Sequence, residues 1–143
     1  MISLVVLPFY SEAMKCLVVT PEKTALDMEA TSVVLPLFDG EFGVMSGHTP
    51  MIARIGAGEL RIKSPQGNTV HYYVEGGFVE VLDDIIALLT MHAVPVDELD
   101  VDHEEQEFAE ALSRPGDTPE LALIREERLH SRRARLRVAK KTH

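Results

Sequence analysis

The first two thirds of the chain consist of short apolar segments separated by turn residues. Six segments are rich in Val, Ile, Leu, Thr and Tyr, namely residues 15–20, 31–37, 60–64, 69–75, 78–82 and 85–89. In residues 60–64, apolar Leu60 and Ile62 alternate with charged residues, which is the period of a half-buried strand. Turn signals recur roughly every 8–12 residues. This rhythm predicts a β-sandwich or barrel rather than alternating strands and helices.

The pattern changes from strand to helix after residue 95. Residues 97–110 carry eight acidic residues and no Lys or Arg. Asp97 is the predicted N-cap of a first helix, with Asp100 three residues later in the usual place of Glu. The apolar positions that share one face of this helix are Val101, Phe108 and Leu112.

A second helix is predicted after a break at residues 114–118. Thr118 is its predicted N-cap and Pro119 its first residue. Its apolar positions repeat every seven residues, at Ala122, Leu129 and Leu136. An acidic and a basic helix joined by a short break predict an antiparallel hairpin. Because the hairpin has few large apolar residues, we expect it to be weakly docked and able to detach.

The sequence therefore divides into an N-terminal β-sandwich over residues 1–95 and a helix-turn-helix arm over residues 96–143. The net charge of −9 is unevenly distributed, and its sign changes within the arm rather than at its start. Residues 1–118 hold 20 acidic and six basic residues, whereas residues 119–143 hold eight basic and three acidic ones. An acidic body and a basic segment without interleaved aromatic residues disfavour nucleic-acid binding. They favour pairing of the basic helix with the acidic helix or with an acidic protein.

Length and cysteine content limit the class of protein further. A chain of 143 residues buries enough surface to fold without a disulfide or a metal. Cys16 is the only cysteine, which excludes an intrachain disulfide and favours a reducing compartment. The longest uncharged apolar run, residues 85–96, falls well short of the roughly 20 residues of a membrane span.

No constellation of residues indicates chemistry of its own. Ser46 and His48 are the one candidate pair for nucleophilic catalysis, but the nucleophile-elbow spacing and a third carboxylate are absent. The histidines lack metal-ligand spacing, and residues 97–110 lack the central glycine of a calcium loop. Gly56-Ala-Gly58 and Gly76-Gly77 lack a phosphate-loop frame and indicate bends where strands change sheet. We predict no catalytic, metal or cofactor site.

Three stretches together carry a resemblance to a known family. They are Val19-Thr-Pro-Glu-Lys23, Asp39-Gly-Glu-Phe-Gly-Val-Met-Ser-Gly-His-Thr-Pro50 and Tyr73-Val-Glu-Gly-Gly-Phe-Val-Glu-Val81. Their order and spacing, followed by an acidic and then a basic helix, resemble the epsilon subunit of F-type ATP synthases. The resemblance implies a flattened β-sandwich of about ten strands followed by an α-helical hairpin. It also implies a non-catalytic subunit.

The function implied by the resemblance is mechanical coupling in a rotary motor. Epsilon subunits sit in the central stalk, bind the gamma subunit and rest on the polar loops of the c-ring, which protons or sodium ions drive. In bacteria the helical arm can extend toward the catalytic alpha/beta head and inhibit ATP hydrolysis. For this chain the resemblance implies a peripheral position at the cytoplasmic face of a bacterial cell membrane, without insertion into it.

The resemblance also assigns residues to these contacts. Glu41, Gly43, Gly47 and His48 stand where the family places its c-ring contact loop. The alternative that the two glycines only satisfy backbone geometry stays open. The arginines expected to act in the inhibitory arm, by meeting an acidic surface on the head, are Arg128, Arg132, Arg133 and Arg135.

Three departures from the family pattern change the expectations. Ser46 replaces the usual Pro, which predicts a less stiff loop. Residues 99–104 read Leu-Asp-Val-Asp-His-Glu where ATP-binding members have a motif of the type [IL]-D-x-x-R-A, so we predict no ATP site. Residues 1–13 have no counterpart in the usual pattern and are interpreted as an extension or a tail.

Two other functions are weighed against the rotor subunit. The first alternative is a stand-alone β-sandwich interaction module with a basic helical tail, which predicts a stable free protein with its own ligand and no stalk partner. The second is an enzyme, which requires an activity that is lost in Ser46→Ala or His48→Ala.

Overall fold

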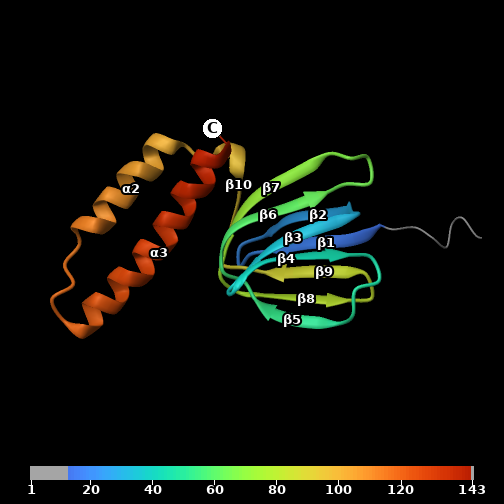
Figure 1. Ribbon diagram of the computed structural model, residues 1–143, viewed down its shortest axis with the longest axis horizontal. Coiled ribbons are helices and arrows are strands. Elements are labelled where there is room, and N and C mark those ends of the chain that lie inside the picture. Colours follow the sequence, from blue (N-terminus) through green and yellow to red (C-terminus); the bar gives the residue numbers. More distant parts are fainter. Residues whose placement is uncertain (1–12, 143) are drawn as a thin grey trace, which may run out of the picture.

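The structure is a computed structural model that describes residues 13–142 of the chain. It contains two packed β-sheets followed by two helices (Figure 1). The strands are β1 (Met14–Val19), β2 (Thr24–Ala30), β3 (Ser32–Leu37), β4 (Gly40–Met45), β5 (Met51–Arg54), β6 (Ala57–Lys63), β7 (Thr69–Glu75), β8 (Phe78–Leu82), β9 (Ile85–Leu89) and β10 (His92–Pro95). The expected ten-stranded sandwich with a helical hairpin is confirmed. The predicted extension at residues 1–13 lies almost wholly outside the described residues.

Each sheet has five strands. Sheet A has the order β2-β1-β9-β8-β5, and sheet B has the order β10-β7-β6-β3-β4. The paired strands within residues 13–142 are antiparallel except β1 with β9, which run parallel from Lys15 opposite Ile85 to Val19 opposite Leu89. The connections β5–β6 and β7–β8 carry the chain from one sheet to the other. These are the bends that the sequence predicted at Gly56-Ala-Gly58 and Gly76-Gly77.

The main core lies between the two sheets. Alternate side chains of each strand point inward, as in β1, where Met14, Cys16 and Val18 are buried and Lys15 is exposed. The inward side chains are almost entirely aliphatic, and they include Val33, Leu35, Leu60, Ile62, Val79, Ile86 and Leu88. Burial raises the pKa of the Cys16 thiol to about 12, so that thiol stays protonated and unreactive.

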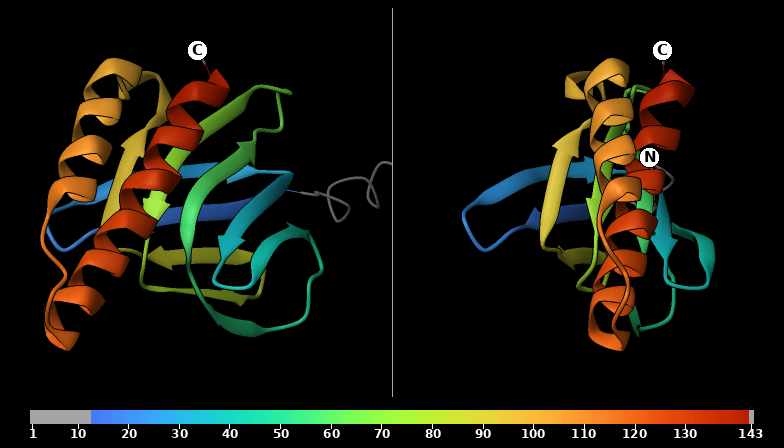
Figure 2. Two further views of the ribbon diagram at one scale, coloured as in Figure 1. Left: turned by 60° about the vertical axis from the view of Figure 1, so that its left-hand side comes forward. Right: turned by 90° about the vertical axis from the view of Figure 1, so that its left-hand side faces the viewer.

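Two helices form the arm, which lies against one end of the sandwich (Figure 2). A short 3-10 helix, η2 (Val96–Glu98), leads into α2 (Val101–Ser113), and α3 (Pro119–Thr142) returns along it. The predicted cap at Asp97 is wrong, since Asp100 is the N-cap and its side chain accepts the Asp102 N–H at 3.2 Å. The reason is tertiary: Val96 and Leu99 are buried, which keeps residues 96–99 out of the helix.

The second helix begins where the sequence predicts. The Thr118 hydroxyl accepts the Leu121 N–H at 3.1 Å, and Pro119 is the first residue of α3. The predicted apolar face of α2 is partly wrong, because Leu112 is 46% exposed and Ala111 is buried in its place. None of the helices within residues 13–142 is long and apolar enough to cross a membrane.

Candidate partner-binding surfaces

The loop that contains His48 lies at the end of the sandwich remote from the arm. It follows β4, and its glycine, Gly47, has a left-handed φ of +83° that favours glycine. The His48 ring takes an edge-on position against Phe42, with the ring centroids 5.5 Å apart, and its Nδ1 lies 2.7 Å from the Thr49 carbonyl oxygen. His48 is half-buried, so one part of the ring is held by the protein and another part faces solvent.

Ser46 and His48 do not form a catalytic pair. The Ser46 hydroxyl donates to a carboxylate oxygen of Asp84 at 3.3 Å, while the His48 ring faces Thr49 and Phe42. A nucleophile requires its base within hydrogen-bond reach, and here each side chain is directed at a different partner. Among residues 13–142, no group of three or more His, Cys, Asp and Glu side chains is arranged to hold a metal ion.

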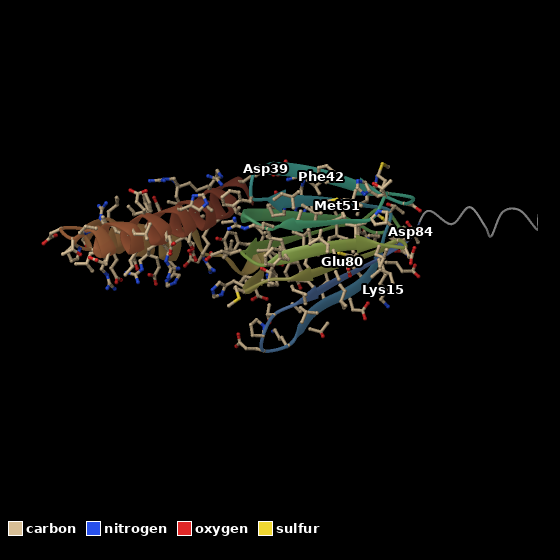
Figure 3. All side chains as sticks on the ribbon, turned by 90° about the horizontal axis from the view of Figure 1, so that it is seen from below. Lys15, Asp39, Phe42, Met51, Glu80 and Asp84 are labelled. Atoms are coloured by element: carbon tan, nitrogen blue, oxygen red, sulfur yellow. The ribbon has the colours of Figure 1, made fainter. Side chains whose placement is uncertain are left out.

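Glu41 lies at the other end of strand β4, on the side of the arm. Its carboxylate accepts two hydrogen bonds from the Arg61 guanidinium, at 3.0 and 3.2 Å. These hydrogen bonds hold the pKa of Glu41 below its ordinary value. Figure 3 shows the separation, with Asp39 near the helices and Asp84 at the far end of the sandwich. The interpretation of residues 41–48 as one loop is therefore wrong, because residues 40–45 are an edge strand.

The two glycines of the predicted contact differ in what the backbone requires of them. Gly47 needs its left-handed conformation, which supports the structural interpretation of that residue. Gly43 lies within β4, and a Cβ built there has no other atom within 4 Å. Steric fit within this chain therefore does not explain Gly43, and its part in a partner contact stays a prediction.

The outer face of sheet A carries an exposed apolar patch, which the sequence did not indicate. Ile52 is 72% exposed and Leu89 is 60% exposed, and Phe78 lies beside Leu89 in the strand register. The exposed apolar residues of this face, called here the sheet A patch, are Ile52, Phe78, Leu82, Ile85 and Leu89, and the charged Glu80 lies among them, opposite Ile52 in the register. Apolar residues occur on both faces of β8 and β9, but only the strand register brings them beside Ile52.

The arm docks on sheet B through one small apolar cluster and a set of carboxylates. The cluster joins Ala134, Val138 and Ala139 of α3 to Tyr73, Val96 and Leu99. Above it, the Tyr73 hydroxyl and the Ser131 hydroxyl both donate to Glu75 at 2.6 Å. Burial and the hydrogen bond to Glu75 raise the pKa of Tyr73 far above its ordinary value.

A second carboxylate, Glu59, ties the C-terminal end of α3 to sheet B. Glu59 is only 6% exposed and accepts hydrogen bonds from Arg61 at 3.1 Å, His71 at 2.9 Å and Lys141 at 3.1 Å. Burial alone raises the pKa of Glu59, but the hydrogen bonds from Lys141, His71 and Arg61 outweigh it and lower the pKa. Lys141 is the one member of this group on α3, so the group is a clasp between arm and sandwich.

The two helices of the arm are held together by a buried ion pair. Glu104 of α2 is 2% exposed and pairs with Arg135 of α3 at 3.1 Å. The Arg135 guanidinium also lies over the Tyr73 ring, 5.2 Å from its centroid. Buried polar contacts therefore hold the arm in addition to the few apolar contacts that the sequence predicted.

Comparisons with known proteins show which family the chain is similar to. The family model described as "ATP synthase, Delta/Epsilon chain, beta-sandwich domain" matches residues 13–96. An ATP synthase epsilon chain from Rhodopirellula baltica is 47% identical over 128 residues, covering 90% of this chain and 99% of that one. A second, from Rubrobacter xylanophilus, is 35% identical and covers 88% of this chain and 82% of its own.

The chain belongs to the epsilon subunit family of F-type ATP synthases.

As an epsilon subunit it is a non-catalytic component of the central stalk. The fold agrees with solved structures. A chain of the Euglena gracilis mitochondrial ATP synthase OSCP/F1/c-ring structure aligns with a TM-score of 0.78 at 21% identity, covering 92% of this chain and 82% of that one. A chain of the Tetrahymena thermophila central stalk/c-ring structure aligns with a TM-score of 0.65 at 17% identity, covering 90% and 95%. Family membership favours the motor subunit over the stand-alone module and the enzyme.

The four arginines expected to act in the epsilon arm are not equivalent in the docked state. Arg135 pairs with Glu104, and Arg133 lies over the Phe108 ring at 5.6 Å. Arg128 and Arg132, together with Arg135, line a cleft of about 340 Å³ between α3 and the sandwich. Arg133 and Arg135 thus contact α2 in the docked arm, and Arg135 faces the cleft as well, beside Arg128 and Arg132.

The segment compared with the ATP-binding motif has a different role from the expected one. Glu104, which stands in the place of the motif's alanine, is turned inward and paired with Arg135. The absence of an ATP site in this epsilon subunit stays a prediction, and its remaining support is His103 in the place of the motif's arginine.

Proposed function

We propose that this epsilon subunit couples rotation of the c-ring to the catalytic head by binding the gamma subunit, and that its arm regulates ATP hydrolysis. The observation that carries the proposal is the sheet A patch, which exposes five large apolar side chains on one face of a rigid sandwich. Exposed apolar patches of this kind mark protein interfaces. The gamma subunit is the proposed partner of this face, because it is the stalk partner that the family implies.

The proposed c-ring contact is the edge strand β4 with the loop that follows it. Glu41, Gly43, Gly47 and His48 all lie on this edge, although not in one loop. Phe42 and Met45 are also exposed there. The ring would hold the epsilon subunit at the cytoplasmic face of a bacterial cell membrane, as a peripheral protein.

The proposed regulatory element is the arm. When the arm is docked, its contacts are with sheet B; when it is extended, its basic residues meet an acidic surface of the alpha/beta head. The change in population is limited by the difference in affinity of the arm for these two positions. Arg128 and Arg132 are the residues to test, because Arg133 and Arg135 also stabilise the docked hairpin.

The test of the coupling function is co-purification from the host. A tag on the wild-type chain is expected to recover a gamma subunit and the catalytic head. Ile52→Asp combined with Leu89→Asp places two charges on the sheet A patch and is expected to reduce gamma recovery at least tenfold. The matched control is Leu123→Asp, an equally exposed leucine on the arm, which should leave gamma recovery unchanged. Undiminished recovery with the patch variant would reject this interface.

The test of the arm uses Arg128→Ala with Arg132→Ala in the assembled enzyme. We expect ATP hydrolysis to rise about twofold to fivefold if these charges hold the extended arm on the head, since rim charges contribute modestly. Lys23→Ala removes one positive charge from an exposed position on the sandwich, and it is the control for the loss of a single charge. Unchanged hydrolysis would reject inhibition through these arginines without affecting the coupling function.

A further inference from the structure

The loop over residues 46–50 carries His48 but has few constraints of its own. Ser46 has no ring to restrict its backbone, and Gly47 has no side chain to restrict its own. The local bonds of the loop are that of the His48 N–H to the Met45 carbonyl oxygen at 3.2 Å and that between His48 Nδ1 and the Thr49 carbonyl oxygen at 2.7 Å. A loop that is ordered only upon binding loses affinity through the entropy of ordering.

Asp84 supplies constraints from outside the loop. Its Oδ1 accepts the Gly47 N–H at 2.8 Å, and its Oδ2 accepts the Ser46 hydroxyl at 3.3 Å. Both oxygens of one carboxylate are therefore directed at consecutive residues of the same loop. Hydrogen bonds to an ionised acceptor are stronger than neutral ones, which makes this an effective anchor.

The anchor is itself fixed to sheet A. Asp83 and Asp84 form the two-residue turn between β8 and β9, with left-handed φ values of 51° and 60° that suit a tight hairpin. The carbonyl oxygen of Asp84 accepts the Lys15 N–H of β1 at 2.9 Å. Since β4 belongs to sheet B, the Asp84 side chain links the two sheets at the end of the sandwich opposite the arm.

We propose that Asp84 is a positioning residue: its carboxylate holds the loop over residues 46–50 in the conformation in which His48 meets the partner. The Ser46 hydroxyl takes part in this anchoring, so the loop is restrained although position 46 is not a proline. The inference about the partner rests on the proposed function, whereas the inference about the loop rests on the two hydrogen bonds alone.

The loop is tested by amide hydrogen exchange of Gly47 in the full chain, measured by NMR. Asp84→Ala is expected to speed exchange of the Gly47 amide about tenfold, because its acceptor is lost. Asp83→Ala is the matched control, since it removes the same charge from the same turn at the same backbone conformation. Asp84→Asn keeps an acceptor and suits the left-handed turn, so it should restore exchange to within about twofold of wild type.

The docking role is tested with the same variants by association with ATP synthase depleted of its epsilon subunit. Asp84→Ala is expected to weaken association about fivefold, while Asp83→Ala and Asp84→Asn should bind as the wild type does. Unchanged Gly47 exchange in Asp84→Ala overturns the anchor. Faster exchange with unchanged association overturns the role in docking. Failure of the wild type to associate overturns the proposed function, and the exchange data still decide whether Asp84 holds the loop.

Discussion

The sandwich core and the arm interface are built from different kinds of side chain. Between the sheets the contacts are between large aliphatic residues, with no ion pair among the members of the core cluster. Between α3 and sheet B the apolar contacts join Ala134, Val138 and Ala139 to Tyr73, and the polar contacts pair Ser131 with Glu75 and Lys141 with Glu59. Separating the two sheets would expose aliphatic surface, whereas releasing the arm exposes mainly groups that water can solvate. The arm therefore has the composition of a reversible contact, and the sandwich that of a permanent one.

The largest expected effect is on the sandwich. Leu60→Ala removes a fully buried side chain and should lower the free energy of unfolding by about 3 kcal/mol, through lost burial and the cavity left behind. The measurement is urea unfolding followed by circular dichroism. Ile52→Ala truncates an aliphatic residue on the exposed face and should change the free energy by less than about 0.5 kcal/mol. Equal losses in the two variants would contradict the described core.

An intermediate effect is expected inside the arm. Arg135→Ala leaves Glu104 buried without its partner and removes the contact over Tyr73, which should destabilise the docked arm by about 2 kcal/mol. Amide exchange should then accelerate within residues 101–142 and stay unchanged in β6 and β8. Arg137→Ala replaces an exposed arginine two positions further along α3, and it serves as the control. Uniform acceleration through the whole chain would show that arm and sandwich are one cooperative unit.

The smallest expected effect is the dependence of arm docking on pH. Docking adds the Lys141 hydrogen bond to Glu59, which lowers the pKa of that carboxyl further than Arg61 and His71 of the sandwich do, so Glu59 stabilises docking at neutral pH and loses this contribution as the pH falls through the lowered pKa. Below pH 4.5 the docked population should fall, by an amount corresponding to less than about 1 kcal/mol, since Lys141 is largely exposed. The readout is the distance between labels on the arm and the sandwich.

Glu59→Gln separates this contribution from those of the other acids. The variant should show weaker docking at pH 7 and a flatter response below pH 4.5. Glu120→Gln changes an exposed acid at the start of α3 and should keep the wild-type response. An identical pH response in Glu59→Gln and wild type would exclude Glu59 as the titrating group.

The sequence predicted the elements whose pattern is local. In strands such as β7 and β8, inward and outward side chains alternate within a few residues. The start of α3 at Thr118 and Pro119 depends on the four consecutive residues 118–121. The local signal for strand β4 was weak, because its two glycines and exposed edge position give it little pattern of its own. Whether Asp97 or Asp100 caps α2 depends on the burial of Val96 and Leu99. That burial comes from contacts with distant residues, so the neighbouring sequence does not predict it.

The candidate site was predictable only in part for the same reason. The residues of the 39–50 motif were found because they are contiguous, but the bonds that place them come from far along the chain. Asp84 reaches Gly47 across 37 positions, and Lys141 reaches Glu59 across 82. The sheet A patch joins β5, β8 and β9, whose alignment depends on the strand register rather than on sequence order.

The parallel pairing of β1 with β9 has a consequence for biosynthesis. Lys15 finds its neighbour Ile85 70 residues later, so β1, the first strand within residues 13–142, must wait for almost the last strand of the sandwich. Such non-local closure is slow, and the unpaired edge of β1 is open to aggregation until β9 emerges. The helices are translated after β9, so the nascent sandwich has all strands of sheet A before any part of the arm exists.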